Sequence, residues 1–254
     1  MIQKIYYYET VEVYLIEMRS KGKSFKQQAA DQALSYVDSG MVIGLGSGST
    51  TTYFIEILGK KLKVGHLHNI TGVPTSAETA RLAKALGIPL VSLAELAPET
   101  PLPTLDLAVD GADEIDPDLN LIKGLGHALL REKIIASHAR QFIVIADESK
   151  LVPHLGQGPL PVEIVQFEAE THVRWLSSLG CKAELWLEQG GTPVVTDNGN
   201  FLARCWFPEG ISDPYSLARV LADHPGIVEH GLFLEMADLV IIAGTEGIQL
   251  KERK

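Results

Sequence analysis

The chain has 254 residues and a mass of 27.6 kDa, and 46% of its residues are hydrophobic against 21% charged, which excludes a disordered or low-complexity chain. Its 32 acidic residues outnumber 22 lysines and arginines, and the resulting net charge of -10 argues against a general nucleic-acid or anionic-membrane surface. Two cysteines exclude a disulfide framework, and apolar runs such as residues 239–243 are far shorter than the ~20 residues of a membrane span, so we expect a cytoplasmic protein.

Residues 1–24 are interpreted as an N-terminal extension of unknown role. Glu9, Glu12 and Glu17 interrupt its apolar residues, and no small-residue cleavage site follows an apolar run. We therefore do not expect a secretory signal.

From Phe25 onward, helical periodicity alternates with short apolar runs, which is typical of an α/β fold. In the first half of the chain the pattern predicts helices over residues 29–37, 50–58, 76–86 and 128–139, and strands over 41–45, 105–109 and 142–146. Thr75 and Glu78 have the spacing of a capping box, and Gly87 suits a left-handed helix terminator.

The second half repeats a strand-helix-strand order. The pattern predicts strands over residues 162–167, 183–187, 201–207 and 227–232, and helices over 171–179 and 215–222. Residues 193–196 read as an additional strand that feeds a tight hairpin at Asn198-Gly199. Two such units favour a split βαβ, ferredoxin-like module.

Residues 237–243 are apolar almost throughout, as expected of a fully buried parallel strand, so we place them back in the first sheet. The predicted fold is a doubly wound, mostly parallel α/β sheet (25–155 and 235–254) with an inserted smaller ferredoxin-like α+β domain (156–234). Residues 153–161 are the predicted outgoing linker.

The first motif with chemical potential is GLGSGST, residues 44–50, between a predicted strand and a helix. Its glycine amides and hydroxyls suit an anion such as phosphate at a helix N-terminus. Ser49 stands where a dinucleotide fingerprint needs its third glycine, and no lysine follows to make a P-loop. A plain strand-to-helix turn explains the loop equally well.

The second motif is VDGADEID, residues 109–116, at the end of a predicted buried strand. Asp110 and Asp113 can face one cleft, where mutual repulsion and partial desolvation would raise one pKa for proton transfer. A backbone-capping turn is the simpler alternative. A metal held by Asp110, Asp113, Glu114 and Asp116 is a further alternative, but calcium-loop spacing is absent and we expect no metal.

The third motif is KGLGHALLREK, residues 123–133. Lys123 with Gly124 and Gly126 offers a cation and free amides to an oxyanion. Glu132 falls on a largely apolar stripe of the following helix, so it is either desolvated as a base or paired at the surface with Arg131 or Lys133. Spacing alone favours the surface ion pair, and it favours a loop hydrogen bond for His127.

Taken in order, GLGSGST, DGADEIDPDLNLIKG, ALLREKIIA, IADESK, LPVEI and VVTDNGN resemble ribose-5-phosphate isomerase of type A from about residue 25 to residue 249. DGADEID followed by LREKI is the specific part of the match. The resemblance implies a doubly wound domain with a smaller α+β domain. It also implies metal-free, cofactor-free interconversion of ribose 5-phosphate and ribulose 5-phosphate through an enediolate, in the non-oxidative pentose phosphate pathway.

The resemblance assigns roles to individual residues. Glu132 matches the general base, Lys123 the cation that stabilises the enediolate, Asp110 the ring-opening carboxylate, and Asp113 the group that moves protons among the sugar oxygens. The substrate-contacting positions are Ser47, Gly48, Ser49, Thr50, Asp110, Gly111, Ala112, Asp113, Lys123, Gly124, Leu125, Gly126 and Lys150, with Lys26 as a weaker match to a phosphate ligand. The family also commonly forms homodimers or homotetramers.

The chain departs from the family at one point. An unbroken run of glycines usually follows the lysine, whereas here the sequence is Lys123-Gly124-Leu125-Gly126-His127. If the fold needs a positive φ at Leu125, that residue carries strain of order 1 kcal/mol or more. His127 adds a donor that the family does not generally use.

Two other classes of function remain open. A sugar-phosphate sensor like the effector domains of deoxyribose-type repressors shares the glycine loop, but no helix-turn-helix is evident before that loop. An amino-sugar phosphate deaminase, or an acyl-CoA transferase with a glutamate nucleophile, has a related architecture. The first predicts specific DNA binding, and the transferase predicts a covalent adduct on Glu132.

Overall fold

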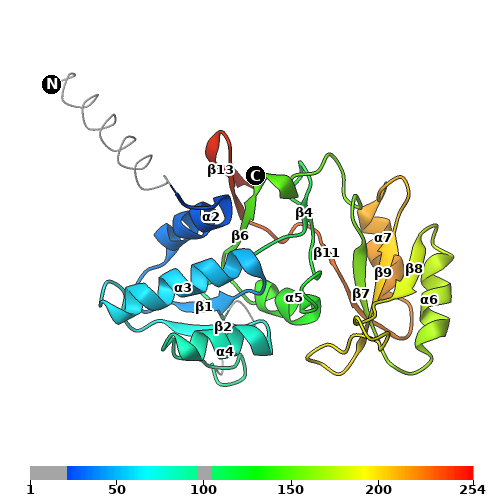
Figure 1. Cartoon of the computed structure of the whole chain (residues 1–254), viewed down its shortest axis with the longest axis horizontal. Helices are drawn as coiled ribbons and strands as arrows, with labels where there is room; N and C mark the ends of the chain where they lie inside the picture. The colour runs from blue at the N-terminus through cyan, green and yellow to red at the C-terminus, as the bar shows by residue number, and fades with distance from the viewer. Residues whose placement is uncertain (1–21, 97–103, 254) are drawn as a thin grey trace.

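The computed structural model describes residues 22–96 and 104–253 (Figure 1). Most of the predicted extension lies outside these ranges. The largest sheet has six strands in the order β13-β12-β6-β3-β1-β2, parallel except for the pairing of β13 with β12. Its strands are β1 (Val42–Leu45), β2 (Thr71–Pro74), β3 (Leu107–Asp110), β6 (Phe142–Asp147), β12 (Leu239–Gly244) and β13 (Gly247–Glu252).

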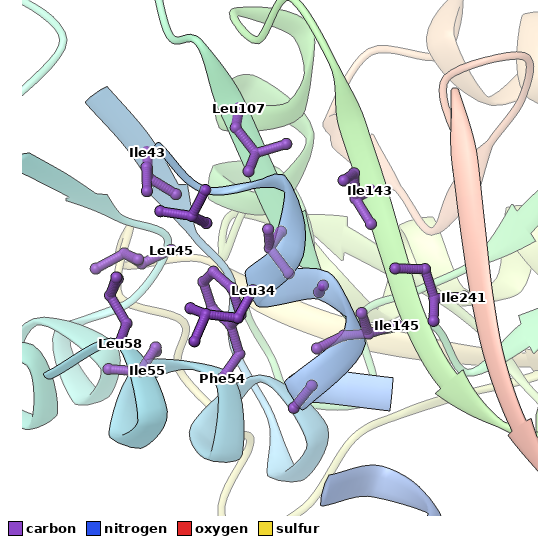
Figure 2. Packing of buried hydrophobic residues seen from close by; sticks show 14 of the residues in the cluster. Leu34, Ile43, Leu45, Phe54, Ile55, Leu58, Leu107, Ile143, Ile145 and Ile241 are labelled. Atoms are coloured by element: carbon purple, nitrogen blue, oxygen red, sulfur yellow. The ribbon is translucent and has the colours of Figure 1, made fainter. Parts of the chain in front are cut away.

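Helices cover both faces of this sheet, as the doubly wound prediction requires. They are α2 (Phe25–Ala33), α3 (Ser49–Lys63), α4 (Ala77–Ala85) and α5 (Leu129–Ser137), with short 3-10 turns η1 (Leu34–Tyr36) and η2 (Glu148–Lys150). Because side chains alternate along a strand, Ile43 and Ile145 pack toward α2 and α3, where Phe54 fills the centre of the cluster (Figure 2). Ala108 and Val144 point to the opposite face, toward Ile135 of α5.

The inserted segment forms a second, fully antiparallel sheet in the order β10-β7-β9-β8. Its elements are β7 (Leu160–Ile164), α6 (Ala169–Ser177), β8 (Lys182–Leu185), β9 (Phe201–Trp206), α7 (Pro214–Ala222) and β10 (Ile227–His230). This is the predicted ferredoxin-like arrangement. We propose the division at residues 156 and 234, because this sheet has its own cluster of buried apolar residues.

A third sheet of three short strands lies between the other two and was not predicted. Its strands are β4 (Glu114–Ile115), β5 (Leu121–Ile122) and β11 (Leu232–Phe233), in the order β11-β5-β4. The predicted strand over 227–232 therefore divides at Gly231. The Gly231 N–H donates to Pro161 O in the small unit, and its carbonyl accepts from Lys123 N beside β5.

Several helices and strands differ from their predicted bounds, for identifiable reasons. The first helix begins at Phe25, not residue 29, because Ser24 and Gln27 form a capping box that the periodicity did not show. Ser76, not Thr75, caps α4, and Gly87 has the expected positive φ of 74°. Residues 193–196 are not a strand: single bridges join Leu187 to Pro193 and Val195 to Phe201, around the expected Asn-Gly turn.

Candidate active site

A cavity of about 100 Å³ opens where the carboxyl ends of β1 and β3 lie side by side. From β1 the chain passes through α3 to β2 on one side, and it returns to β3 on the other, so this is the point where the strand order reverses. All of the predicted substrate-contacting residues except Asp110 and Leu125 line the cavity, together with Glu132 and Lys26. The structure thus brings the glycine-rich loop of residues 44–50 together with the motifs of residues 109–116 and 123–133.

The inner end of the cavity holds a buried charge cluster of Asp110, Lys123 and Glu132, which are 2%, 2% and 5% exposed. Lys123 Nζ lies 3.1 Å from Asp110 Oδ2 and 3.3 Å from Glu132 Oε2, and it donates to Gly111 O at 2.6 Å. Glu132 Oε2 has no hydrogen-bond partner among the described residues. The only close polar contact of this buried oxygen among those residues is thus its ion pair with Lys123.

Burial controls the protonation of this cluster. Desolvation raises the pKa of Glu132 to about 8, aided by the negative charges of Asp110 and Asp113 and opposed by Lys123. For Lys123, burial works against the ammonium, but the charges of Asp110, Glu132 and Asp113 outweigh it and raise its pKa. Lys123 therefore stays charged at neutral pH, while the proton affinity of Glu132 lies near neutrality.

Asp110 lies behind Lys123 and does not line the cavity. Its Oδ1 accepts from Ser47 N at 3.1 Å and Gly111 N at 2.7 Å. Burial raises the pKa of Asp110 against the lowering effect of Lys123 and these amides. The raised pKa of one aspartate agrees with the expectation, and desolvation is its main cause. Asp113 itself lines the cavity.

The loop after Lys123 corrects the expectation about Leu125. Positive φ occurs at Gly124 (109°) and His127 (66°), and Leu125 is outside that region. Leu125 carries no such strain, and its N–H donates to Asp113 Oδ2 at 2.9 Å. The strain of a left-handed residue with a side chain falls on His127 instead. The His127 ring packs against Trp186, and the expected hydrogen bond within the loop comes from the backbone: the His127 N–H donates to Gly124 O at 3.0 Å.

The surface ion pair expected for Glu132 is wrong. Arg131 instead binds the hairpin of the small sheet through Asp197 and Asn198, and Lys133 pairs with Glu229 of β10 at 2.6 Å. Glu132 turns inward because α5 packs beneath the large sheet. Spacing within one helix could not show that Lys123, from a separate loop, provides its partner.

The outer end of the cavity is built on the N-terminus of α3. Gly48 precedes the helix without a side-chain cap, so its first amides and the hydroxyls of Ser49 and Thr50 face an incoming anion. Lys26 of α2 donates to Ser49 Oγ at 2.8 Å, and Lys150 lines the same end. Lys26, the weaker match to a phosphate ligand, thus lies beside the other predicted substrate-contacting residues. Ser47 differs, because its hydroxyl already bonds Thr75, Ser76 and Thr79.

Gly46 and Thr51 were missed by the sequence analysis. A β-carbon on Gly46 would lie 2.2 Å from Asp110 Oδ1, so only glycine lets the loop close over that carboxylate. Thr51 Oγ1 donates to the same oxygen at 3.4 Å. The glycine-rich motif pointed to a ligand, but it gave no sign that one glycine accommodates a side chain from β3.

The structure distinguishes between the interpretations of the acidic motif, residues 109–116. Asp116 forms the backbone-capping turn, accepting from Asp118 N and Asn120 N, and Glu114 instead accepts from the amides of Gly156 and Gln157. Within residues 22–96 and 104–253, no three His, Cys, Asp or Glu side chains are grouped to hold a metal ion. The same ranges contain no helix long and apolar enough to cross a membrane.

The fold and the cavity together define an α/β enzyme that places a buried carboxylate and lysine at one end of a small polar site and the N-terminus of a helix without a side-chain cap at the other. A model of the family described as ribose 5-phosphate isomerase A (phosphoriboisomerase A) matches residues 71–247. The ribose-5-phosphate isomerase A of Roseiflexus castenholzii is 50% identical over 225 residues, covering 88% of this chain and 93% of the relative.

The Pyrococcus horikoshii relative of the same name is 46% identical over 234 residues, covering 91% of this chain and 99% of its own. Solved structures of ribose 5-phosphate isomerases are also similar to this chain. A D-ribose-5-phosphate isomerase in complex with phospho-erythronic acid superposes with a TM-score of 0.84 at 46% identity, over 90% of this chain and 98% of that one. The Plasmodium falciparum ribose 5-phosphate isomerase gives 0.85 at 37%, over 91% and 98%. The chain belongs to the ribose 5-phosphate isomerase A family.

Proposed function

We propose that the protein interconverts D-ribose 5-phosphate and D-ribulose 5-phosphate, a step of the non-oxidative pentose phosphate pathway, with Glu132 as general base. The observation that carries this proposal is the carboxylate of Glu132, which borders the inner end of the cavity, is almost completely buried and lies 3.3 Å from Lys123 Nζ. The hydroxyls and lysines of the outer end suit the phosphate. The substrate then spans the two ends.

In the forward direction Glu132 takes the proton from C2 of the open-chain aldose. The electron pair forms the C1–C2 double bond, and the carbonyl bond shifts its charge to O1, giving an enediolate. Lys123 and the amides of the Gly124–Gly126 loop stabilise that oxygen. Glu132 returns the proton to C1, and moving a proton from O2 to O1 completes the ketose.

The raised pKa of Glu132, about 8, fits this role. A carboxylate with its ordinary pKa is a poor base for a carbon acid, whereas a desolvated one binds the proton more strongly and still releases it at neutral pH. The buried lysine beside it keeps part of the population ionised. Burial thus makes a carboxylate into a usable base.

Asp113 is the better placed of the two aspartates for proton transfers among the sugar oxygens, because it lines the cavity. Ring opening, which the family resemblance gave to Asp110, falls more naturally to Asp113 in this geometry. Asp110 acts through Lys123, which it holds 3.1 Å away and keeps charged.

A coupled assay with ribose 5-phosphate in the presence of EDTA tests the function and its proposed metal independence together. Turnover is expected. No turnover with or without divalent cations would overturn the proposal. Specific DNA binding in a gel shift would favour the sensor, and a covalent adduct on Glu132 after incubation with acyl-CoA would favour the transferase.

We also propose an oligomeric state and a location. A homodimer or homotetramer follows from the family, and light scattering of the purified chain tests it. A cytoplasmic location fits Cys181 and Cys205, which are free and buried. Fractionation of cells tests it.

A further inference from the structure

His127 has a backbone conformation that a residue with a side chain adopts at a cost. Its φ is 66°, in the left-handed region, directly after Gly126 and just before α5. Nothing in the proposed chemistry uses this imidazole. Some contact of the His127 side chain must therefore hold the backbone there.

That contact comes from the small unit. The His127 ring meets Trp186 edge to face, with ring centroids 4.4 Å apart and an interplanar angle of 85°. Trp186 follows β8, and the guanidinium of Arg204 lies 4.9 Å from its ring. Arg204 is held in turn by an ion pair with Glu184 at 2.8 Å. Burial lowers the pKa of His127, assisted by Arg204 and opposed by Glu188, so the ring is neutral at pH 7.

On its other side, His127 closes the loop that lines the cavity. Its N–H donates to Gly124 O at 3.0 Å, which makes a tight turn of Gly124, Leu125 and Gly126. Within this turn the Leu125 N–H reaches Asp113 at 2.9 Å, and Gly126 borders both the catalytic cavity and a neighbouring cavity of about 680 Å³. A change in the His127 backbone would therefore move the amides that face the substrate.

We infer that His127 is a positioning residue for the oxyanion-binding loop, and that the Trp186 ring holds it in its left-handed conformation. The inference rests on the proposed function, because the loop matters for rate only if it stabilises the enediolate. The small unit thus contributes to catalysis through His127. Its Trp186 ring provides the packing contact that offsets the backbone strain of a side chain at position 127.

Two variants at one position separate the β-carbon from the ring. H127A keeps the β-carbon and its backbone cost but loses the ring, so kcat should fall by roughly five- to tenfold, with KM for ribose 5-phosphate within about twofold. H127G removes the cost as well and should recover most of that loss. Affinity for phospho-erythronic acid, the compound named with a solved relative, should fall in H127A while the affinity for inorganic phosphate holds.

The tryptophan is tested by a double-mutant cycle. W186A should lower kcat in the wild-type background but not in H127G, where no side chain needs support. Trp186 also packs with Leu129 and Leu202, so melting temperatures are compared in every variant. Equal losses of kcat in H127A and H127G, or no loss in either, would overturn the inference.

Hydrogen exchange at the Leu125 amide gives a readout that does not depend on activity. Exchange should become faster in H127A and in W186A than in the wild type, because the bond to Asp113 loosens. If exchange became faster in both variants but the wild type failed to turn over ribose 5-phosphate, the proposed function would be wrong and the positioning role of His127 would be supported. Unchanged exchange would remove the positioning role.

Discussion

Both ends of the cavity contain lysines, but the surroundings of these lysines are very different. At the inner end Asp110, Lys123 and Glu132 are almost completely buried, and at the outer end Ser49 is exposed and Lys26 and Lys150 are half-buried. Electrostatic interactions are stronger where water is excluded, so the inner charges set one another's proton affinities. The outer charges are screened and are suited to binding. The comparison predicts that inner variants change turnover and outer variants change affinity.

The largest expected effect is that of Glu132→Gln. Removing the base should lower kcat by roughly three orders of magnitude, while the dissociation constant for ribose 5-phosphate, measured by calorimetry, changes only a few-fold. Glu170→Gln, an exposed position on α6, is the matched control and should leave both unchanged. Substantial turnover by the Glu132 variant would remove this residue from its role.

Lys123→Met should have the next largest effect. Losing the cation at the developing oxyanion is expected to lower kcat by about a hundredfold. The pKa of Glu132 should also rise further, because the one charge that opposes its burial is gone. A pH profile of kcat/KM would then show its acidic limb at higher pH. A profile displaced to lower pH would contradict the ion pair.

At the outer end, Lys150→Ala and Lys26→Ala should each raise KM by about tenfold with kcat nearly unchanged. The increase should shrink as salt is added, because the added ions screen the charges of these half-buried lysines in the wild type. Lys182→Ala, an exposed lysine of β8 away from the cavity, is the control. A large loss of kcat without a change in KM would contradict the proposal that the outer end serves binding and the inner end serves turnover.

Asp113→Asn sharpens the description of the inner end. The negative charge of Asp113 helps raise the pKa of Glu132, so its removal should shift the acidic limb of kcat/KM to lower pH, opposite to Lys123→Met. This shift is independent of any loss of rate from missing proton transfers. An unshifted limb would show that Asp113 and Glu132 do not interact.

The smallest effect is on stability. Because the pKa of Glu132 is raised from 4.5 to about 8 on folding, the folded state holds a proton that the unfolded state releases between those values. Glu132 therefore favours folding fully below pH 4.5 and progressively less as the pH rises toward 8. The melting temperature of Glu132→Gln relative to wild type should increase from pH 5 to pH 8. A constant difference would mean that Glu132 is not desolvated.

The large sheet was predictable because each of its central strands is buried on both faces. Residues 239–243 and 142–146 are continuous apolar runs for that reason, and the structure contains them as β12 and β6. The strands of the third sheet have only two residues each, too few for any periodicity. They exist because Gly231 and Lys123 pair across segments that are far apart in the sequence.

For the site, the motifs identified the residues but not their surroundings. The position of Glu132 on an apolar stripe was visible, yet its burial depends on Lys123 arriving from another loop. The position of Asp110 behind Lys123 depends on Gly46 leaving room. The strain at His127, and not at Leu125, depends on the backbone of the whole turn. Such facts arise from tertiary packing, which local patterns do not encode.

The bond from Lys123 N to Gly231 O also bears on how the protein is made. Gly231 lies near the end of the inserted unit, and its own N–H donates to Pro161 O near the beginning of that unit. A nascent chain on the ribosome therefore has the lysine long before it has the carbonyl that fixes it. The backbone contact of the buried lysine can therefore form only after nearly all of the polypeptide has been made.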